Sequence, residues 1–220
     1  MIQKNIIEYL KTLQINNNKP WFDAHKKRYD EARAAFIQTV DTIIPAIAKF
    51  DSDIGNLAAK ECIFRINRDV RFSKNKLPYK NNMAAYFNRA GKKGTGAGYY
   101  LHIEPGRSFA AAGIWMPLPA DLSKIRQEID YNFDEWKKII GGSSFKNQFQ
   151  NGVDKSNSLL RPPKGYEPGN DAIDFIKLKS FVTTKPLTDA DLMSKSFVAD
   201  LSKTFKTVKP MINFINRALD

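Results

Sequence analysis

Six cationic side chains and one carboxylate lie within the sixteen residues from Arg65 to Lys80. The cations are Arg65, Arg68, Arg71, Lys74, Lys76 and Lys80. With Asp69 as the carboxylate, the segment has a net charge of 6 − 1 = +5. Neighbouring cations repel, so such a segment must stay hydrated, find carboxylate partners or surround an anion. Apolar and aromatic residues interrupt the charges, which is not typical of a plain basic tail. They are Val70, Phe72, Leu77 and Tyr79. We interpret the segment as a shaped anion-binding site, with a solvated basic loop as the alternative.

Within this segment the residue types suggest different roles. Arginine presents a planar fork to carboxylate or phosphate, whereas lysine supplies a point charge. Asp69 lies among arginines, and we expect it to orient one guanidinium; acting as a base or metal ligand is the alternative. Tyr79 is expected either to close over a ligand ring or to pack.

A second cationic motif reads Arg161-Pro162-Pro163-Lys164-Gly165-Tyr166. Two prolines hold the backbone extended, so Arg161 and Lys164 should project from a stiff frame. Tyr166, like Tyr79, is expected to close over a ligand or to pack. The hypothesis of an anion pocket requires Arg65 or Arg68 to converge with Arg161 or Lys164.

Three polar residues alternate along a segment with strand character, Gly98–Glu104. A period of two places Tyr100, His102 and Glu104 on one face and apolar residues on the other. That face is either solvated or the floor of a site. If the site is catalytic, His102 and Glu104 are the expected proton carriers, with Asp69 as a further candidate, because a strand holds side chains in fixed geometry.

Other catalytic chemistries fit the sequence poorly. One cysteine and two histidines cannot form a tetrahedral zinc site without carboxylates, so we expect no metal and no cofactor. Cys62 lies in an apolar segment and is expected to be a core thiol rather than a nucleophile paired with His102 or His25. The glycine-rich run 91–98 has neither phosphate-loop spacing and is interpreted as a hairpin connection.

Composition points to a folded basic protein. The chain has 220 residues, 35 basic and 23 acidic, and thus a formal charge of +12, which favours anionic partners. A single cysteine suits a reducing compartment. No secretory leader and no stretch of about 20 apolar residues is evident, so we expect a cytoplasmic protein without a membrane partner.

The elements that would position these residues can be read from periodicity and capping. Apolar residues spaced three and four apart predict a helix over residues 2–13, then a long helix from Trp21 toward Pro45, which should kink or end it. Asn16-Asn17-Asn18 should separate the two helices and cap the second. His25, on the apolar stripe, is expected to pack or cap.

Strands are predicted at 62–66, 83–88, 98–104, 108–115 and 179–185, with a tight turn at Pro105-Gly106-Arg107. Helices are predicted near 119–131, 133–140, 172–178, 190–205 and 210–218, with 141–170 irregular. We therefore expect a single α+β domain spanning residues 1–220. Its antiparallel sheet should have about five strands, flanked by N-terminal, middle and C-terminal helices.

Several of these motifs together resemble the family catalogued as domain of unknown function 2461. They are Asn17-Asn18-Lys19 with Trp21-Phe22, the block from Arg65 to Lys80, Tyr99–Gly106, and Pro163-Lys164-Gly165-Tyr166. Pro20 and Asn75 depart from the family pattern, which has acidic residues there. The resemblance covers nearly the whole chain and implies a single α+β domain, but no activity.

Three functional hypotheses remain open. The first is a pocket for a small anionic ligand, phosphorylated or carboxylated, in a protein that is either a binder or an enzyme. The second is nucleic-acid binding by the same basic surface, with Phe72, Tyr79 or Tyr86 stacking on bases. The third is docking of an acidic protein partner. The oligomeric state is not specified by the sequence.

Overall fold

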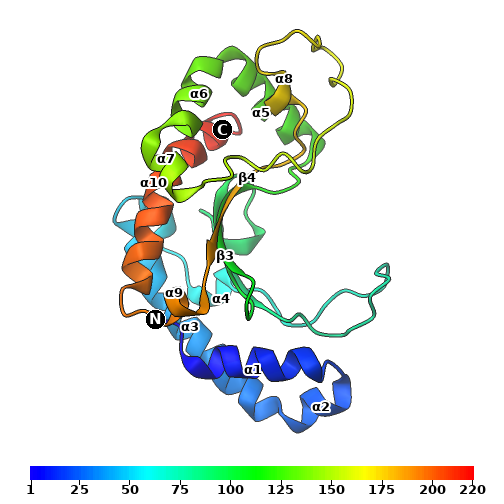
Figure 1. Cartoon of the computed structure of the whole chain (residues 1–220), viewed down its shortest axis with the longest axis vertical. Coiled ribbons are helices and arrows are strands. Elements are labelled where there is room, and N and C mark those ends of the chain that lie inside the picture. The colour runs from blue at the N-terminus through cyan, green and yellow to red at the C-terminus, as the bar shows by residue number, and fades with distance from the viewer. The chain divides into compact units, whose positions relative to one another are not determined.

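Four antiparallel strands form one sheet in the order β1-β2-β3-β4, so each strand pairs with its neighbour in sequence (Figure 1). The strands are β1 (Met83–Phe87), β2 (Gly98–Ile103), β3 (Ser108–Ile114) and β4 (Phe181–Leu187). Helices make up most of the remaining regular structure, which confirms the predicted α+β class.

The glycine-rich run lies in the connection between the adjacent strands β1 and β2.

The expected number of about five strands is one too many. Residues 62–66 do not form a strand, because Cys62 ends the short helix α4 (Ala59–Cys62). Only Ile63 forms an isolated antiparallel bridge, to Ala85 of β1, and the Phe64 amide donates to the Ala84 carbonyl at 3.0 Å. The apolar character of this segment therefore reflects burial beside the sheet rather than a ladder of its own.

The computed structural model describes residues 1–220, which divide into two compact units. Unit 1 comprises Met1–Lys93, Tyr100–Ala110 and Pro186–Ser202; unit 2 comprises Gly94–Tyr99, Ala111–Lys185 and Lys203–Asp220. Each unit is thus assembled from three separate stretches of chain. The prediction of a single domain spanning residues 1–220 stays a prediction.

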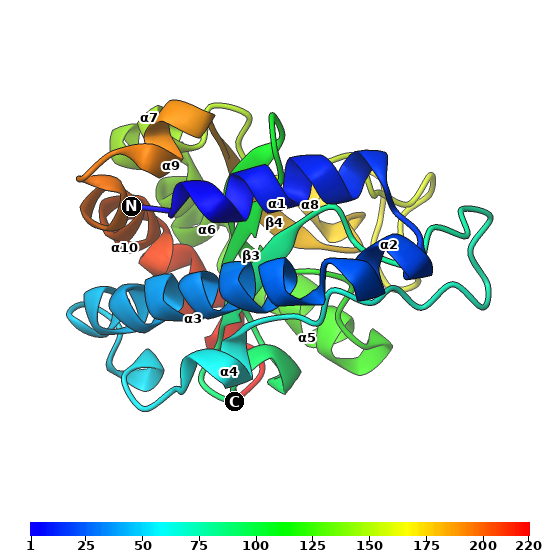
Figure 2. The same cartoon turned by 90° about the horizontal axis from the view of Figure 1, so that it is seen from below.

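Unit 1 begins with three helices, α1 (Lys4–Ile15), α2 (Lys19–Ala24) and α3 (Lys26–Ala48). Helices α1 and α3 lie side by side (Figure 2) and bury the faces that the apolar spacing predicted. The side chain of Asn18 caps α2 by accepting from the Trp21 amide at 3.0 Å. The long helix expected from Trp21 is interrupted at His25, and α3 continues past Pro45 to Ala48.

The rest of unit 1 consists of short elements around this helical layer. They are η1 (Ser52–Ile54), α4, β1, η2 (Gly91–Lys93), the greater part of β2, the start of β3, and α9 (Asp189–Met193). Helix α9 starts with a capping box, in which the Thr188 hydroxyl accepts from the Asp191 amide and the Asp191 carboxylate accepts from the Thr188 amide.

Unit 2 is built around the fully buried indole of Trp136. Its ring contacts those of Phe175, Phe181 and Phe214 at centroid distances of 5.7, 6.2 and 5.2 Å. The helices of this unit are α5 (Pro119–Tyr131), α6 (Phe133–Gly141), α7 (Ser143–Gln148), α8 (Ile173–Ile176) and the greater part of α10 (Phe197–Arg217). Helix α7 falls in the region expected to be irregular.

The closing helices break at a different place from the predicted one. The chain leaves the helical conformation after Met193, and α10 then runs from Phe197 to Arg217 through Pro210. A proline inside a helix costs about 3 kcal/mol. Val208, Met211, Ile212, Phe214 and Ile215 are all almost fully buried, and each large apolar side chain contributes roughly 1.5–3 kcal/mol. Burial therefore outweighs the proline.

One glycine of the sheet is required by close packing. Gly113 in β3 has φ 125°, and a Cβ there would lie 1.9 Å from the carbonyl oxygen of Phe181 in β4. No side chain fits at that distance.

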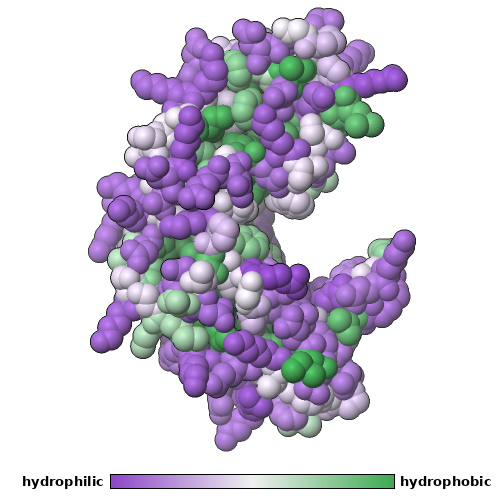
Figure 3. Space-filling view, viewed as in Figure 1, coloured by the Kyte–Doolittle hydropathy of each residue, from purple (hydrophilic) through white to green (hydrophobic).

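The surface drawn in Figure 3 is largely hydrophilic with separate hydrophobic patches. None of the helices combines the length and the apolar character needed to cross a membrane.

Candidate functional site

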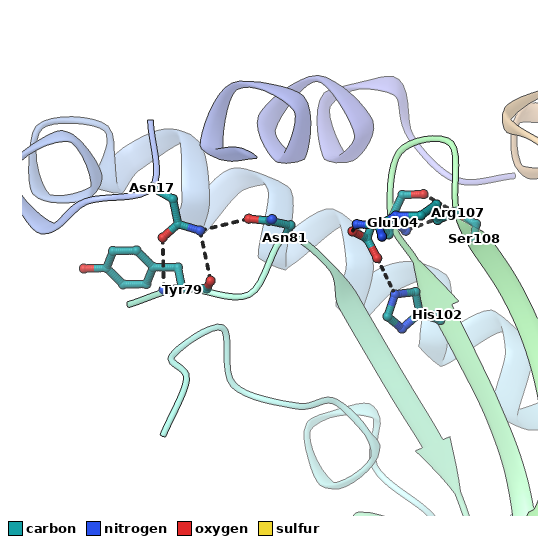
Figure 4. A network of polar contacts seen from close by, with 7 residues as sticks. All are labelled: Asn17, Tyr79, Asn81, His102, Glu104, Arg107 and Ser108. Atoms are coloured by element: carbon teal, nitrogen blue, oxygen red, sulfur yellow. Dashed lines mark hydrogen bonds and ion pairs between the residues drawn. The ribbon is translucent and has the colours of Figure 1, made fainter. Parts of the chain in front are cut away.

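The polar face of β2 carries a line of hydrogen-bonded side chains within unit 1, and Figure 4 shows its His102–Glu104 part. The Tyr100 hydroxyl lies 3.0 Å from His102 Nδ1, and His102 Nε2 lies 3.1 Å from Glu104 Oε2. The side chains of His102 and Glu104 are each only 12% exposed. These are the three residues that strand alternation grouped on one face, and the opposite face is fully buried at Leu101 and Ile103.

Glu104 is fixed from three directions just beyond the end of β2. Its Oε1 accepts from Arg107 Nη2 at 2.5 Å, while its backbone amide donates to Ser108 Oγ at 3.0 Å. The Ser108 hydroxyl in turn donates to the Glu104 carbonyl at 2.8 Å. A turn closes this arrangement, since the Arg107 amide donates to the Glu104 carbonyl and Gly106 has φ 73°. The carboxylate is therefore held in one position.

Aromatic rings enclose the line from the sides. Phe109 of β3 stacks on the His102 imidazole, with a centroid distance of 4.6 Å and an interplanar angle of 13°. Phe64 meets the Tyr100 ring edge-on at 6.1 Å. The Phe109 ring reduces hydration of the imidazole, which favours its uncharged form.

The electrostatic environment keeps His102 neutral. Burial lowers its pKa; the hydrogen bond to Glu104 opposes this, and the charges of Arg107 and Lys80 lower it further. A neutral imidazole has one N–H, which must be on Nε2 because a carboxylate can only accept. Nδ1 then accepts from the Tyr100 hydroxyl. Burial and the charge of Glu104 raise the pKa of Tyr100 to about 12, so the phenol is protonated and can donate.

Lys80 links this line to the basic segment. It is half-buried, and burial, followed by the charge of Arg65, lowers its pKa. Its ammonium lies 5.3 Å from the centre of the Phe64 ring, which also borders Tyr100. Lys80 acts electrostatically on His102 as well. The last cation of the segment thus lies in the same neighbourhood as the polar line.

The other cations of the segment divide into two groups. Arg68 and Lys76 bind carbonyls of the segment itself: Arg68 Nη1 donates to Leu77 O at 2.8 Å, and Lys76 Nζ donates to Val70 O at 3.0 Å. Arg71 forms a two-pronged pair with Asp69, at 3.0 and 2.7 Å, which lowers the pKa of that exposed carboxyl.

Arg65 and Lys74 are exposed and form no hydrogen bond or salt bridge, although the charge of Arg65 acts on Asp69 from a distance. They are therefore the cations of the segment that remain free to meet an outside anion.

Tyr79 packs inside unit 1. It is 6% exposed and stacks on Phe22 at 4.0 Å with an interplanar angle of 14°. Its backbone amide and carbonyl both bind the side chain of Asn17, at 3.1 and 3.0 Å (Figure 4). Of the two alternatives for Tyr79, packing describes its contacts.

The second cationic motif belongs to unit 2. Arg161 and Lys164 are exposed without hydrogen-bonded or ionic partners, and Gly165 has φ 93°. Tyr166 is partly buried, and burial together with Asp130 raises its pKa. Convergence of these residues with Arg65 or Arg68 stays a prediction, because the two motifs lie in different units.

Unit 2 also has a hollow of about 520 Å³ with acidic walls. Asp130, Asp134, Glu135 and Asp171 line it together with Lys137. Its charge is opposite to that expected for an anion pocket, and it contains none of the predicted site residues. Nowhere do three or more metal-binding side chains of the His, Cys, Asp and Glu types come together in a group that could hold a metal ion.

The remaining chemistry-bearing residues have packing roles. Cys62 is fully buried, and burial raises the pKa of its thiol to about 11. His25 stacks on Trp21 at 4.3 Å, and its Nδ1 lies 2.8 Å from the Trp21 carbonyl oxygen, between α2 and α3.

Sequence reasoning missed Arg107, Ser108 and Phe109 as neighbours of the polar line. The short turn after Glu104 could have predicted these neighbours, because it returns the chain along β3 directly beside β2.

These features define an α+β protein with an antiparallel meander sheet and a desolvated Tyr–His–Glu line on one strand. A family model described as "Conserved hypothetical protein (DUF2461)" matches residues 5–214, and the chain belongs to this family. No curated protein and no solved structure matches the chain.

Proposed function

We propose that the polar face of β2 binds a small anionic ligand, carrying a phosphate or carboxylate group, and removes a proton from it. The observation that carries this proposal is the line Tyr100–His102–Glu104, which is ordered, desolvated and bordered by Lys80. Lys80 supplies the charge that attracts the anion, and the low polarity around it strengthens that attraction.

The line has the arrangement of a reacting group, a base and an orienting carboxylate. Tyr100 and Glu104 are the two ends of the line, and Tyr100 is the end that lies away from the carboxylate. Its oxygen accepts the ligand proton while its own proton passes to His102 Nδ1. The resulting imidazolium is stabilised by Glu104, which Arg107 holds in place. A positioned acid–base group of this kind contributes about 10²- to 10⁴-fold to a rate.

The binding step can be tested by thermal unfolding with a panel of phosphorylated and carboxylated metabolites. A ligand that binds the folded state raises Tm by mass action, with about 2.7 kcal/mol of stabilisation at 100 times its Kd. Lys80→Gln should abolish the shift. Lys27→Gln, an equal change of charge at an exposed position of α3, should retain it. Equal shifts in parent and Lys80→Gln would contradict the proposal.

The proton-transfer step is tested separately with Tyr100→Phe. This variant keeps the ring and its contacts with Phe64 and Phe109 but lacks the hydroxyl. It should bind the same ligand with a similar Tm shift, while conversion of that ligand, followed by NMR, falls at least about 100-fold. Conversion at the parent rate would show that Tyr100 has no part in the chemistry.

A further inference from the structure

The segment from Arg65 to Lys80, here called the basic arm, projects from the rest of unit 1 in both Figure 1 and Figure 2. Its two sides are joined near the base by the bridge between Asn67 and Tyr79. The Arg68 amide donates to Pro78 O at 2.9 Å, and the Lys80 amide donates to Ile66 O at 2.8 Å. The arm is therefore a paired ribbon rather than an unstructured loop.

Side chains of the arm hold its outer part in shape. Arg68 reaches across to Leu77 O and to Ser73 Oγ, and Lys76 binds Val70 O. The Asn75 side chain accepts from the Leu77 amide at 2.9 Å. These contacts hold the backbone of the arm from within and leave most of its outer side chains exposed to solvent.

What the arm presents outward is an aromatic ring among cations. Phe72 is 96% exposed, and the Arg71 guanidinium lies 5.9 Å from its ring centre. Arg65 and Lys74 are exposed and unpaired. A lone exposed aromatic residue is common on protein surfaces. Here, however, it stands in a segment of net charge +5 whose one carboxylate is already paired with Arg71.

We infer that the basic arm binds single-stranded nucleic acid. Every base has a flat face that can stack on Phe72, and the phosphates along the strand match the exposed cations that the arm carries. A duplex hides its base faces and offers phosphates and base edges instead. An acidic polypeptide offers charge without a planar partner for the ring. The arrangement uses Phe72, Arg65 and Lys74, none of which belongs to the Tyr100–His102–Glu104 line, so the inference does not rest on the proposed function.

The test is fluorescence anisotropy of the full chain with labelled single-stranded DNA and RNA of roughly 16 nucleotides, within the size range of known single-strand sites. We expect binding at low salt that weakens as salt rises. Phe72→Ala should weaken binding about 5- to 150-fold, because one stacked base is lost. Phe72→Trp should retain binding and show quenched tryptophan emission on adding the strand.

Two controls make the result specific. Tyr131→Ala removes another exposed aromatic ring, from α5 in unit 2, and should bind as the parent does. A plot of log affinity against log salt has a negative slope, and Lys74→Ala should make that slope shallower by about 0.7. This is the value for one phosphate contact with a single strand. Circular dichroism confirms folding of each variant.

Several outcomes would overturn the inference. They are absence of binding at low salt, parent-like affinity of Phe72→Ala, and equal affinity for duplex and single strand, which would indicate charge alone. Displacement of the single strand by polyglutamate at equal charge concentration would likewise point to an acidic protein partner instead.

Discussion

Asn17 binds the backbone of Tyr79 as a neighbouring strand would. Its amide oxygen accepts from the Tyr79 N–H at 3.1 Å, and its amide nitrogen donates to the Tyr79 carbonyl at 3.0 Å. The same nitrogen donates to Asn81 Oδ1 at 2.9 Å. This side chain thereby fixes the base of the basic arm to the end of α1, across 62 residues of sequence.

Asn17→Asp should destabilise the protein by about 3 kcal/mol. The new carboxylate can still accept from the Tyr79 amide, but it cannot donate. It therefore places a buried charge against the Tyr79 carbonyl and the Asn81 side-chain oxygen. Urea unfolding at neutral pH measures the change.

The neighbouring substitution Asn18→Asp is the matched control. Asn18 accepts from the Trp21 amide at the start of α2, and aspartate performs that capping role equally well. Its free energy of unfolding should stay within about 0.5 kcal/mol of the parent. Equal losses in the two variants would show that the Asn17 contacts contribute little.

Gly113→Ala should destabilise the sheet by more than about 3 kcal/mol. The added Cβ would lie 1.9 Å from the Phe181 carbonyl oxygen, and φ of 125° is strained for any L side chain. Gly106→Ala, with φ 73° and no atom within 4 Å of the new Cβ, incurs only the strain, about 1–2 kcal/mol. Thermal unfolding of both variants gives the comparison, and a smaller loss for Gly113→Ala than for Gly106→Ala would contradict the close approach of β3 and β4.

The stability of the protein should fall in mild acid because of His102. The pKa of His102 is lower in the folded chain than in the unfolded one, where it is about 6.5. Below that pH the unfolded state binds more protons, so stability is fully present above about pH 6.5 and declines as pH falls toward the folded pKa. The slope for one proton is at most about 1.4 kcal/mol per pH unit.

Urea unfolding of His102→Gln between about pH 7 and pH 5 should show a shallower decline than the parent. His25→Gln leaves His102 and Glu104 in place and should retain the decline that His102 causes. If the parent and His102→Gln have the same pH slope, the burial of the imidazole contributes nothing to acid sensitivity.

Cys62 should be inert toward thiol reagents in the folded protein. Its side chain is fully buried, and a thiol with a pKa of about 11 is almost entirely protonated near neutral pH, whereas the thiolate is the nucleophile. Labelling by a disulfide reagent at about pH 8 should proceed only as fast as the protein opens, and at once in denaturant. Immediate labelling of the native protein would mean that the Cys62 sulfur is not buried.

The sequence predicted best those features that depend on near neighbours. Alternation along β2 placed Tyr100 and His102 on one face because a strand has a period of two whatever it pairs with. Capping by Asn18 followed from a side chain that binds the first turn of its own helix. Such signals need no knowledge of the tertiary structure.

The features that the sequence did not predict depend on distant contacts. A helix was predicted to begin near Pro210, but α10 runs through this proline, because burial of the surrounding apolar residues exceeds the loss of one backbone bond. Arg68 and Lys76 donate to backbone carbonyls of the basic arm. Every residue has a carbonyl group, so no residue type in the sequence indicates these contacts. Asn17 is one of three consecutive asparagines, and no neighbouring residue indicates that Asn17, rather than Asn16 or Asn18, binds the backbone of Tyr79.

Each of the two units is assembled from three separate stretches of chain, and this affects how the protein can fold during its synthesis on the ribosome. Ser202 Oγ donates to Ala46 O, and Asn216 binds the backbone of Ala97, across 156 and 119 residues. Neither unit can therefore close until its third stretch has been translated, and the nascent helices α1 and α3 must keep apolar surface exposed in the meantime. Each unit should thus complete its folding only after its last stretch has been translated, in contrast to proteins whose domains form one after another as they emerge.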